Sequence, residues 1–551
     1  AIFLHNGRLP TIMASMHKKF QALMLPVGLS LLLFSILATL LPTTPATANI
    51  DALNKLSPDL QTALADADQP LRLIVHLADT AVAPAPLPAA NTDVRRAHLV
   101  DTLQETAVAG QNALQPTLDS LNASGAISQT RSLWLINALA LNATPDAIPT
   151  LAADSAVSRI TLDTAVAIYD PPEARFGSEG ELYFTNVERG SSFPWGIERV
   201  GAPAVWRGLG VDGSGVTVAI VDTGVDWQHP DLLPNYRGNL GPGPVDHAGN
   251  WFSPGFPDAA TPTDFVGHGT HVAGTAVGQN GIGVAPGANW IAVNLTDPSG
   301  LIYTSAIHEA FAWLLAPNGD PALAPDIANN SWGGEGTTTT FVEDIATLQA
   351  AGIIPIFSAG NSGPAAETVG APGSYTSTLA IGASDDLDNP TWFSSRGPSP
   401  LTDEIKPWLI APGADVVSAF PGGGYATSNG TSMAAPHASG TAALLLSANP
   451  ALTEADIWQI LADTAVPITA THPNMTSGWG RLDTLAATAT QLPSARLDGT
   501  VAVDGFPAIA ATVTLTNSSG VTQTFTADAN GRFQTHLRAG DYTISAHSYG
   551  A

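Results

Sequence analysis

Five short apolar runs, rich in β-branched residues, constrain the fold of this chain more than any other feature. Such runs are typical of strands that are buried on both faces of a sheet. They are Val216–Val221, Trp290–Leu295, Ile327–Ser331, Ile353–Phe357 and Leu379–Ala383. Stretches with helical spacing, including Ser305–Leu315 and Phe341–Ala351, lie between them. Alternating strands and helices predict an α/β fold with a doubly wound parallel sheet, whose functional site lies beyond the carboxyl ends of the strands.

The chain has 551 residues, which predicts about two to four domains. We assign residues 191–492 to the α/β domain and residues 49–190 to a smaller domain with its linker. In the smaller domain, strands and helices are expected at Leu71–Leu77, Thr92–Leu121, Leu133–Leu141, Pro145–Ala153 and Val157–Leu162. Their order predicts a small α/β sandwich. From Ala165 to Ser192 the composition is that of a linker.

Residues 493–551 have a different composition, rich in Thr, Val, Gly and Asp. Short strands are expected at Ala510–Leu515, Thr522–Ala527, Gly531–Leu537 and Tyr542–Ala546. Asp528–Gly531 supplies a turn between two of them. This pattern predicts a small β-sandwich, and the last strand-like run ends so close to Ala551 that we expect a truncated domain.

Residues 1–48 resemble a secretion signal. His17–Lys19 form a basic start after Met16, and Leu23–Leu41 is almost wholly apolar. Ala46–Ala48 then gives the small-x-small pattern of a signal-peptidase site. The alternative is a membrane anchor, against which the early Pro26 and the cleavage pattern argue. We therefore expect a secreted protein that keeps no stable membrane span after cleavage.

The overall charge excludes some classes of partner. The formal net charge is −27, with only 20 Lys and Arg residues against 47 Asp and Glu. Nucleic acid and anionic membrane surfaces are therefore not expected to bind. The chain contains no cysteine, so neither disulfides nor thiolate metal sites stabilise it. We expect a monomer whose partners are proteins or peptides.

Gly430–His437 is the segment most suggestive of chemistry. A turn of small residues delivers Ser432 at the start of a long apolar run. Pro436 fits the first turn of a helix, where proline is tolerated. A serine at a helix N-terminus has free N–H groups and a positive dipole end beside it, which can stabilise an oxyanion. Ser432 is thus a candidate nucleophile.

Three further polar residues stand where this fold places a site. Asp222 ends the first apolar run, so its carboxylate opens into the crevice and can orient an imidazole. His268 lies in Gly267–Gly274, a glycine-rich start of an apolar helix. Asn361 follows the run Ile353–Phe357, and its amide is suited to donate to an oxyanion.

Each of these motifs has an alternative interpretation. An Asp at a strand end is usually a cap or turn residue. His268 and His271 could be a metal pair, but their spacing is three and no HExxH pattern is present. The Ser432 segment also resembles the nucleophile elbow of α/β-hydrolases. That fold requires an acid and a histidine after the serine, and Asp463 and His472 lack a glycine-rich setting.

Together, the four residues resemble the active site of subtilisin-like serine proteases (subtilases). The order Asp222, His268, Ser432 is that of the subtilase triad and differs from chymotrypsin-like and α/β-hydrolase enzymes. The resemblance covers most of residues 194–492. It includes Val369–Ser374, Phe393–Pro398 and Ala411–Gly413, while Asn330–Gly334 and the inserted Asn235–Asn239 are most similar to the bacillopeptidase F branch.

The resemblance implies a serine endopeptidase. Ser432 would attack the peptide carbonyl, His268 would act as base and Asp222 would hold the imidazole. Asn361 and the backbone N–H of Ser432 would stabilise the oxyanion. The substrate-binding residues implied are Ser331, Trp332, Gly333 and Gly334 as an edge for an extended peptide, and Ser358, Ala359, Gly360 and Gly370 as a pocket for large apolar side chains.

The resemblance also bears on cofactors and processing. We expect no cofactor: Thr275–Val284 is shorter than the calcium loop of many subtilases, although Asp231 stands where a carboxylate ligand could be. Relatives often carry Asp where this chain has Trp408. The segment from Asn49 to about Asp163 resembles an inhibitory propeptide, removed by the enzyme between Ala165 and Phe193. The terminal domain resembles carboxypeptidase-regulatory-like modules.

A rival interpretation is a catalytically silent protein with the subtilase fold, attached to a surface through its β-domain. Degenerate relatives usually lose one member of the triad. Because Asp222, His268 and Ser432 are all present, the sequence favours the enzyme.

Overall fold

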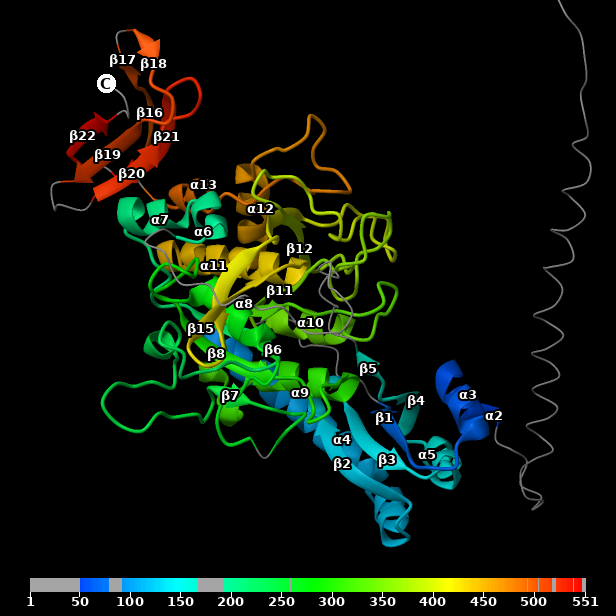
Figure 1. The fold of residues 1–551 in the computed structure, drawn as a ribbon. Helices are drawn as coiled ribbons and strands as arrows, with labels where there is room; N and C mark the ends of the chain where they lie inside the picture. The colour runs from blue at the N-terminus through cyan, green and yellow to red at the C-terminus, as the bar shows by residue number, and fades with distance from the viewer. Residues whose placement is uncertain are drawn as a thin grey trace, which may run out of the picture.

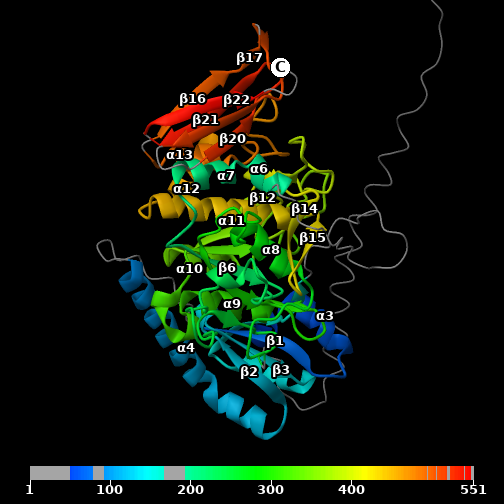
Figure 2. The ribbon, with the colours of Figure 1, turned by 60° about the vertical axis from the view of Figure 1, so that its left-hand side comes forward.

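The computed structural model describes residues 50–78, 92–166, 193–257, 259–492, 494–503, 505–517, 522–538 and 540–547. The expected signal segment and most of the expected linker lie outside these residues. Figure 2 shows three layered units: the N-terminal domain at the base, the central α/β domain, and the C-terminal β-domain at the top.

The central domain is built on a seven-stranded parallel sheet with the order β13-β12-β11-β10-β6-β8-β7. Its strands are β6 Thr217–Asp222, β7 Trp251–Phe252, β8 Asn289–Asn294, β10 Ile327–Asn330, β11 Ile354–Ser358, β12 Leu379–Ser384 and β13 Leu409–Pro412. The five strands expected from apolar runs are confirmed within one or two residues. The short β7 and the proline-ended β13 lack a long apolar run, and the sequence did not reveal them.

The strand order reverses beside β6. The chain runs outward from β6 to β8 and then returns to place β10 on the other side of β6. The connections that follow β6 and β10 therefore run to opposite sides of the sheet, and open α/β sheets bind ligands in the crevice that forms at such a point. Asp222 ends β6, and Ser331 follows the last residue of β10.

Helices cover both faces of this sheet (Figure 1). α8 His268–Val277 and α11 Thr431–Ala448 lie on one face, and α9 Thr304–Leu315 and α10 Val342–Ala350 on the other. Alternate residues of β6 serve the two cores, as the period of two requires: Val218 joins the first and Ala219 the second. Smaller elements are α6 Trp195–Arg199, α7 Ala202–Ala204, η3 Val205–Leu209, the hairpin β14 Val416–Phe420 and β15 Gly424–Ser428, α12 Glu454–Thr464 and α13 Thr484–Ala489.

The N-terminal domain has an antiparallel sheet with the order β2-β3-β1-β4. Its elements are α2 Ile50–Asn54, α3 Pro58–Asp66, β1 Leu71–Leu77, α4 Thr92–Ala123, β2 Ile127–Leu133, β3 Ala138–Ala143, α5 Ile148–Ala153 and β4 Val157–Leu162. The single strand predicted over Leu133–Leu141 was wrong. A short 3₁₀ turn, Trp134–Ile136, and a left-handed Asn137 divide this stretch into a hairpin.

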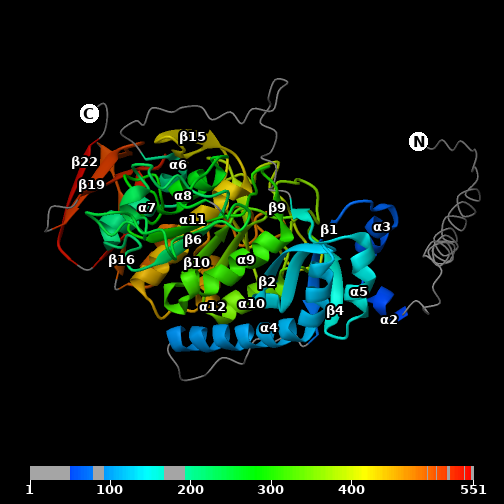
Figure 3. The same ribbon diagram turned by 90° about the horizontal axis from the view of Figure 1, so that it is seen from below.

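The expected linker begins with ordered structure. β5 Ala165–Val166 pairs antiparallel with β9 Ile302–Tyr303 of the central domain. Linker composition reflects low apolar content, and it cannot reveal a strand whose partner lies far away in the sequence. Figure 3 shows α4 running along the outside of the central domain, near α10.

The C-terminal domain is all β, as expected. Its strands are β16 Ser494–Thr500, β17 Ala502–Val503, β18 Phe506–Pro507, β19 Thr512–Asn517, β20 Thr522–Thr526, β21 Arg532–Arg538 and β22 Tyr542–His547. β20, β19 and β22 form one sheet, and β16 pairs with β21. β16, β17 and β18 were not expected from the sequence.

Candidate active site at the switch point of the sheet

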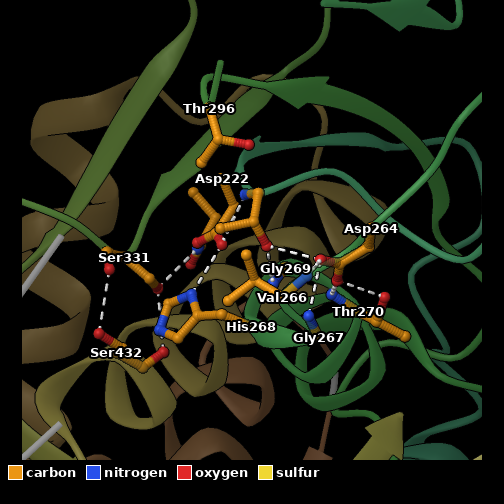
Figure 4. A network of polar contacts seen from close by, with 12 residues as sticks. Asp222, Asp264, Val266, Gly267, His268, Gly269, Thr270, Thr296, Ser331 and Ser432 are labelled. Atoms are coloured by element: carbon orange, nitrogen blue, oxygen red, sulfur yellow. Dashed lines mark hydrogen bonds and ion pairs between the residues drawn. The ribbon is translucent and has the colours of Figure 1, made fainter. Parts of the chain in front are cut away.

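Asp222 and His268 are brought together at the crevice, as the sequence predicts. Nδ1 of His268 lies 2.7 Å from Oδ1 of Asp222, and this oxygen also accepts a hydrogen bond from the N–H of Thr223 at 2.8 Å. The Asp222 side chain is 2% exposed and that of His268 is 18% exposed. A buried carboxylate thus meets an imidazole that keeps one edge accessible, and Figure 4 shows this ring lying between Asp222 and Ser432.

Ser432 is the second residue of α11 and is buried to 2% exposure. Its Oγ donates to the backbone carbonyl of Ser331 at 3.0 Å, and Oγ of Ser331 donates to the carbonyl of Ser432 at 2.9 Å. This reciprocal pair fixes the start of α11 against the end of β10. The preceding Gly430 has φ of 152°, a conformation that favours glycine and lets the chain turn sharply into the helix.

Asn361 follows β11 and faces the same helix start. Its side-chain oxygen accepts hydrogen bonds from the N–H and Oγ1 of Thr431, both at 3.0 Å. These two donors orient the amide, because its oxygen must face Thr431 and its Nδ2 must face away. An amide group held in this way is a preorganised donor at the start of α11.

Asp264 was not singled out from the sequence, yet it organises the loop before His268. Its Oδ1 accepts from the N–H of Gly267 at 2.7 Å and from Oγ1 of Thr223 at 2.9 Å. Its Oδ2 accepts from the N–H and Oγ1 of Thr270 at 2.8 and 2.6 Å. Figure 4 shows these contacts fixing the start of α8. A lone acidic residue in a polar loop gives no sequence signal of such convergence.

The two carboxylates control the charge of His268. Burial by itself lowers the pKa of the imidazole, but the charge and hydrogen bond of Asp222, with the charge of Asp264, outweigh it. The pKa of His268 therefore lies above its ordinary value. Burial also raises the pKa of Asp264, against the hydrogen bonds from Thr270 and Gly267. His268 is thus prepared to accept a proton, since its positive form is stabilised.

Several residues expected to bind substrate are linked to the start of α11 or to one another. Ser331 hydrogen-bonds with Ser432, the N–H of Gly360 donates to Oγ1 of Thr431 at 3.1 Å, and the N–H of Gly370 donates to the carbonyl of Ala359 at 3.0 Å. Ser331, Gly333, Ser358, Ala359, Gly360 and Gly370 are buried and Gly334 is half-buried. The Trp332 side chain is 1% exposed and packs against Phe311, Phe341 and Phe357. Trp332 can therefore offer a peptide only its backbone, because its ring belongs to the core.

The same part of the chain matches known proteins. Residues 213–480 match the family model described as "Subtilase family", a range that contains Asp222, His268, Asn361 and Ser432. Bacillopeptidase F from Bacillus subtilis (strain 168) is 36% identical over 454 residues, which cover 76% of this chain and 30% of that protein. Subtilisin Savinase from Lederbergia lenta is 37% identical over 285 residues, which cover 51% of this chain and 94% of that protein.

The chain belongs to the subtilase family of serine-type endopeptidases. Subtilisin E from Bacillus subtilis (strain 168) is a further relative, 37% identical over 284 residues that cover 50% of this chain and 67% of its own. The expected similarity to bacillopeptidase F is also confirmed, although this subtilase spans less than a third of that protein.

Asp231, the residue considered as a calcium ligand, accepts hydrogen bonds from two other side chains. Oδ1 of Asp231 accepts from the amide of Asn280 at 2.6 Å, and Oδ2 accepts from the hydroxyl of Tyr425 at 2.5 Å. Each oxygen of this carboxylate therefore has one protein donor. Within the described ranges, no group of three or more His, Cys, Asp or Glu residues could hold a metal. None of the described helices is long and apolar enough to span a membrane.

Proposed function

We propose that this subtilase is a secreted endopeptidase that uses Asp222, His268 and Ser432 as its catalytic triad. The observation that carries the proposal is the 2.7 Å contact between the buried Asp222 and Nδ1 of His268, with the other edge of the ring toward Ser432. A serine, an imidazole and a buried carboxylate in this relation are the parts of an acyl-transfer site.

The reaction follows from this arrangement. When a peptide binds, the Ser432 hydroxyl leaves the carbonyl of Ser331 and gives its proton to Nε2 of His268 while Oγ attacks the scissile carbonyl. Asp222 stabilises the imidazolium, which then protonates the leaving amine. Water hydrolyses the resulting acyl-enzyme by the same steps in reverse, and His268 again acts as base.

The negative charge that develops on the oxygen of the scissile carbonyl must be stabilised by hydrogen-bond donors. We assign this role to Nδ2 of Asn361 and the backbone N–H of Ser432. Because Thr431 holds the oxygen of the Asn361 amide, the donor end is fixed before substrate arrives. Preorganised donors of this kind typically supply about 10²- to 10³-fold in kcat.

The N-terminal domain is proposed to inhibit and assist the folding of the protease as a propeptide. Both oxygens of Asp163 accept hydrogen bonds from Ser305, from its N–H and its Oγ, at 2.8 Å each. This carboxylate lies at the positive N-terminal end of α9, where negative charge is stabilising. Arg131 adds an ion pair with Glu309 on the same helix at 2.7 Å.

The end of this domain leads toward the proposed substrate cleft. β5 occupies the edge of β9, and Cγ1 of Val166 lies 3.5 Å from the position that a Cβ on Gly334 would take. A peptide that adds a strand beside Gly334 would use this space. We therefore propose that the chain between Ala165 and Phe193 is cut by the enzyme itself, and that the freed cleft accepts large apolar side chains before the scissile bond.

Residues 1–48 and 493–551 are assigned roles from their sequence patterns. Residues 1–48 are proposed as the secretion signal, and residues 493–551 as a binding or spacer module of a monomeric enzyme. The substrates are proposed to be proteins or peptides.

The test compares Ser432→Ala with Ser447→Ala, which lies on the same helix and donates to the carbonyl of Ser214. Purified Ser432→Ala protein is expected to keep its N-terminal domain and to leave casein intact. Ser447→Ala protein is expected to process itself and to hydrolyse casein, and a serine-reactive phosphonate should block it. Processing by the pure Ser432→Ala protein would exclude self-cleavage, and casein hydrolysis by it would refute the triad. An inert wild-type protein with a matured N-terminus would instead favour the surface-binding alternative.

A further inference from the structure

The start of α9 carries a surface that the N-terminal domain covers with two arginines. The guanidinium of Arg72 lies over the ring of Tyr303, with Cζ 3.6 Å from the ring centroid. The guanidinium of Arg131 pairs with Glu309 at 2.7 Å and donates to Oγ of Ser305 at 3.0 Å. We call Tyr303, Ser305 and Glu309 the α9 patch. Two cations of one domain therefore lie on one helix end of the other.

The α9 patch has the chemistry of a guanidinium site. The face of an aromatic ring attracts a cation, and a carboxylate accepts the N–H groups of a planar guanidinium. Asp297 adds negative charge close by. Although burial acts in the opposite direction, hydrogen bonds from Ser299 and Leu301 and the charge of Arg72 lower the pKa of Asp297. The carboxylate of Asp297 thus stays charged beside the patch.

The charge of the protease domain favours the same kind of partner. Acidic residues outnumber basic ones several-fold in residues 193–492. A surface of this sign attracts cationic segments and repels acidic ones. When the N-terminal domain is removed, the α9 patch loses both arginines, whereas the acidic surroundings remain. The patch is then complementary to another chain that carries arginine.

The α9 patch lies beside the proposed edge for peptide binding. β5 pairs with β9, which ends at Tyr303, and Cγ1 of Val166 approaches the space beside Gly334. Just before β5, the carbonyl of Thr164 accepts hydrogen bonds from the N–H and Oγ1 of Thr304, at 2.9 and 3.0 Å. The chain that precedes β5 therefore crosses the start of α9. A substrate that follows the path of β5 would bring its upstream residues to the patch.

We propose that the α9 patch is an exosite of the processed protease, which binds arginine-bearing segments on the N-terminal side of the scissile bond in protein substrates. Arg72 and Arg131 occupy the exosite first and mask it until the N-terminal domain leaves. The proposal rests on the proposed function, because that function removes the N-terminal domain. The exosite is separate from the pocket for apolar side chains, and it acts on KM rather than on the chemical step.

The experiment compares three peptide anilides that share the same apolar residues before the anilide. One carries an N-terminal extension with three arginines, the second has citrulline in place of each arginine, and the third has no extension. Citrulline keeps the planar shape of arginine and removes its charge. Processed wild-type protein is compared with Tyr303→Leu and Glu309→Gln. Asp463→Asn is the control, because this carboxylate lies on α12 and accepts from the amide of Gln459.

At low ionic strength, kcat/KM of the wild type is expected to be about three- to twentyfold higher for the arginine peptide than for the citrulline peptide, mainly through KM. Glu309→Gln and Tyr303→Leu should each reduce this ratio by about two- to fivefold, and Asp463→Asn should leave it unchanged. Added salt should also reduce the ratio, since the contacts are partly exposed. Equal rates for the two extended peptides, or an equal reduction in all three variants, would overturn the proposal.

A binding measurement separates this proposal from the proposed function. A Ser432→Ala chain with a recognition sequence for an added protease in its linker is cut, and the N-terminal domain is removed in high salt. The labelled arginine peptide should bind this protein more tightly than the citrulline peptide, and should bind the uncut chain less well. If the cut domain stays bound, the arginine peptide should displace it.

The two proposals can therefore fail independently. If the wild-type protein hydrolyses nothing, the proposed function fails, and the titration of the cut Ser432→Ala chain still tests the exosite. Equal binding of the arginine and citrulline peptides, equal binding to cut and uncut chains, or no displacement of a retained N-terminal domain would each refute the exosite.

Discussion

Replacing Asp222 by Asn tests the proposed triad most directly, because the structure predicts two separate consequences. The N–H of Thr223 donates to Oδ1 of Asp222, so an asparagine can keep its oxygen there only by placing its NH₂ at the position of Oδ2. That position is buried, and Oδ2 has no hydrogen-bond partner among the described residues. The opposite orientation points the NH₂ group at both the N–H of Thr223 and Nδ1 of His268, which forces the imidazole proton onto Nε2.

Either orientation of the asparagine amide impairs His268 as a general base. With the proton on Nε2, His268 cannot accept a proton from Ser432, and with the oxygen retained the imidazolium loses its counter-charge. Losses of this type are about 10⁴-fold in kcat, or about 5 kcal/mol in the activation barrier. The pKa of His268 should also fall, because burial then acts without the opposing charge and hydrogen bond of Asp222. The acid limb of the pH profile should therefore move to lower pH while the rate falls.

The assay measures kcat on a peptide anilide across the acid range for wild-type, Asp222→Asn and Asp226→Asn proteins. Asp226 is the control, since its carboxylate accepts from the N–H groups of Gln228 and Gly422 and does not contact His268. Its profile should coincide with that of the wild type. The reasoning is refuted if Asp222→Asn keeps kcat within about tenfold of wild type, or if its acid limb stays in place.

Four further predictions concern the oxyanion donor, Asp231 and the N-terminal domain. Asn361→Ala should lower kcat by about 10²- to 10³-fold with little change in KM, as measured by steady-state kinetics, because only the transition state uses its amide; a rise in KM alone would contradict this. Tyr425→Phe should lower the free energy of unfolding, measured by urea denaturation, by about 1–3 kcal/mol, since Asp231 loses a buried hydrogen-bond donor. EDTA should leave the melting temperature of the wild-type protein unchanged, and a drop in that temperature on adding the chelator would disprove this. Arg131→Ala should shorten the lag before casein hydrolysis by about two- to fivefold, because the partly exposed ion pair with Glu309 is worth about 0.5–1 kcal/mol; an unchanged lag would show that this pair does not retain the N-terminal domain.

The N-terminal domain shows how local patterns succeed and fail in the same region. The helix expected from Thr92 is confirmed as α4, because its apolar spacing is a local property. The hairpin at Leu133–Leu141 was missed because Asn137 turns in a left-handed conformation, which the apolar run around it conceals. The pairing of β5 with β9 was also missed, since its partner lies more than a hundred residues away.

The parallel sheet and the residues of the candidate site could be predicted from local sequence patterns. Fully buried strands must be apolar throughout, and a helix start beside a crevice needs small residues, so both leave local marks around Asp222, His268 and Ser432. Which groups come into contact could be seen only in the folded chain. The Trp332 ring is buried in the core, Asp264 accepts hydrogen bonds from the loop before His268, and the ammonium of Lys406 donates to backbone carbonyls at Tyr375 and Thr378. Backbone carbonyls and N–H groups occur at almost every residue, so their convergence has no residue-type signature and depends on how the folded chain places them.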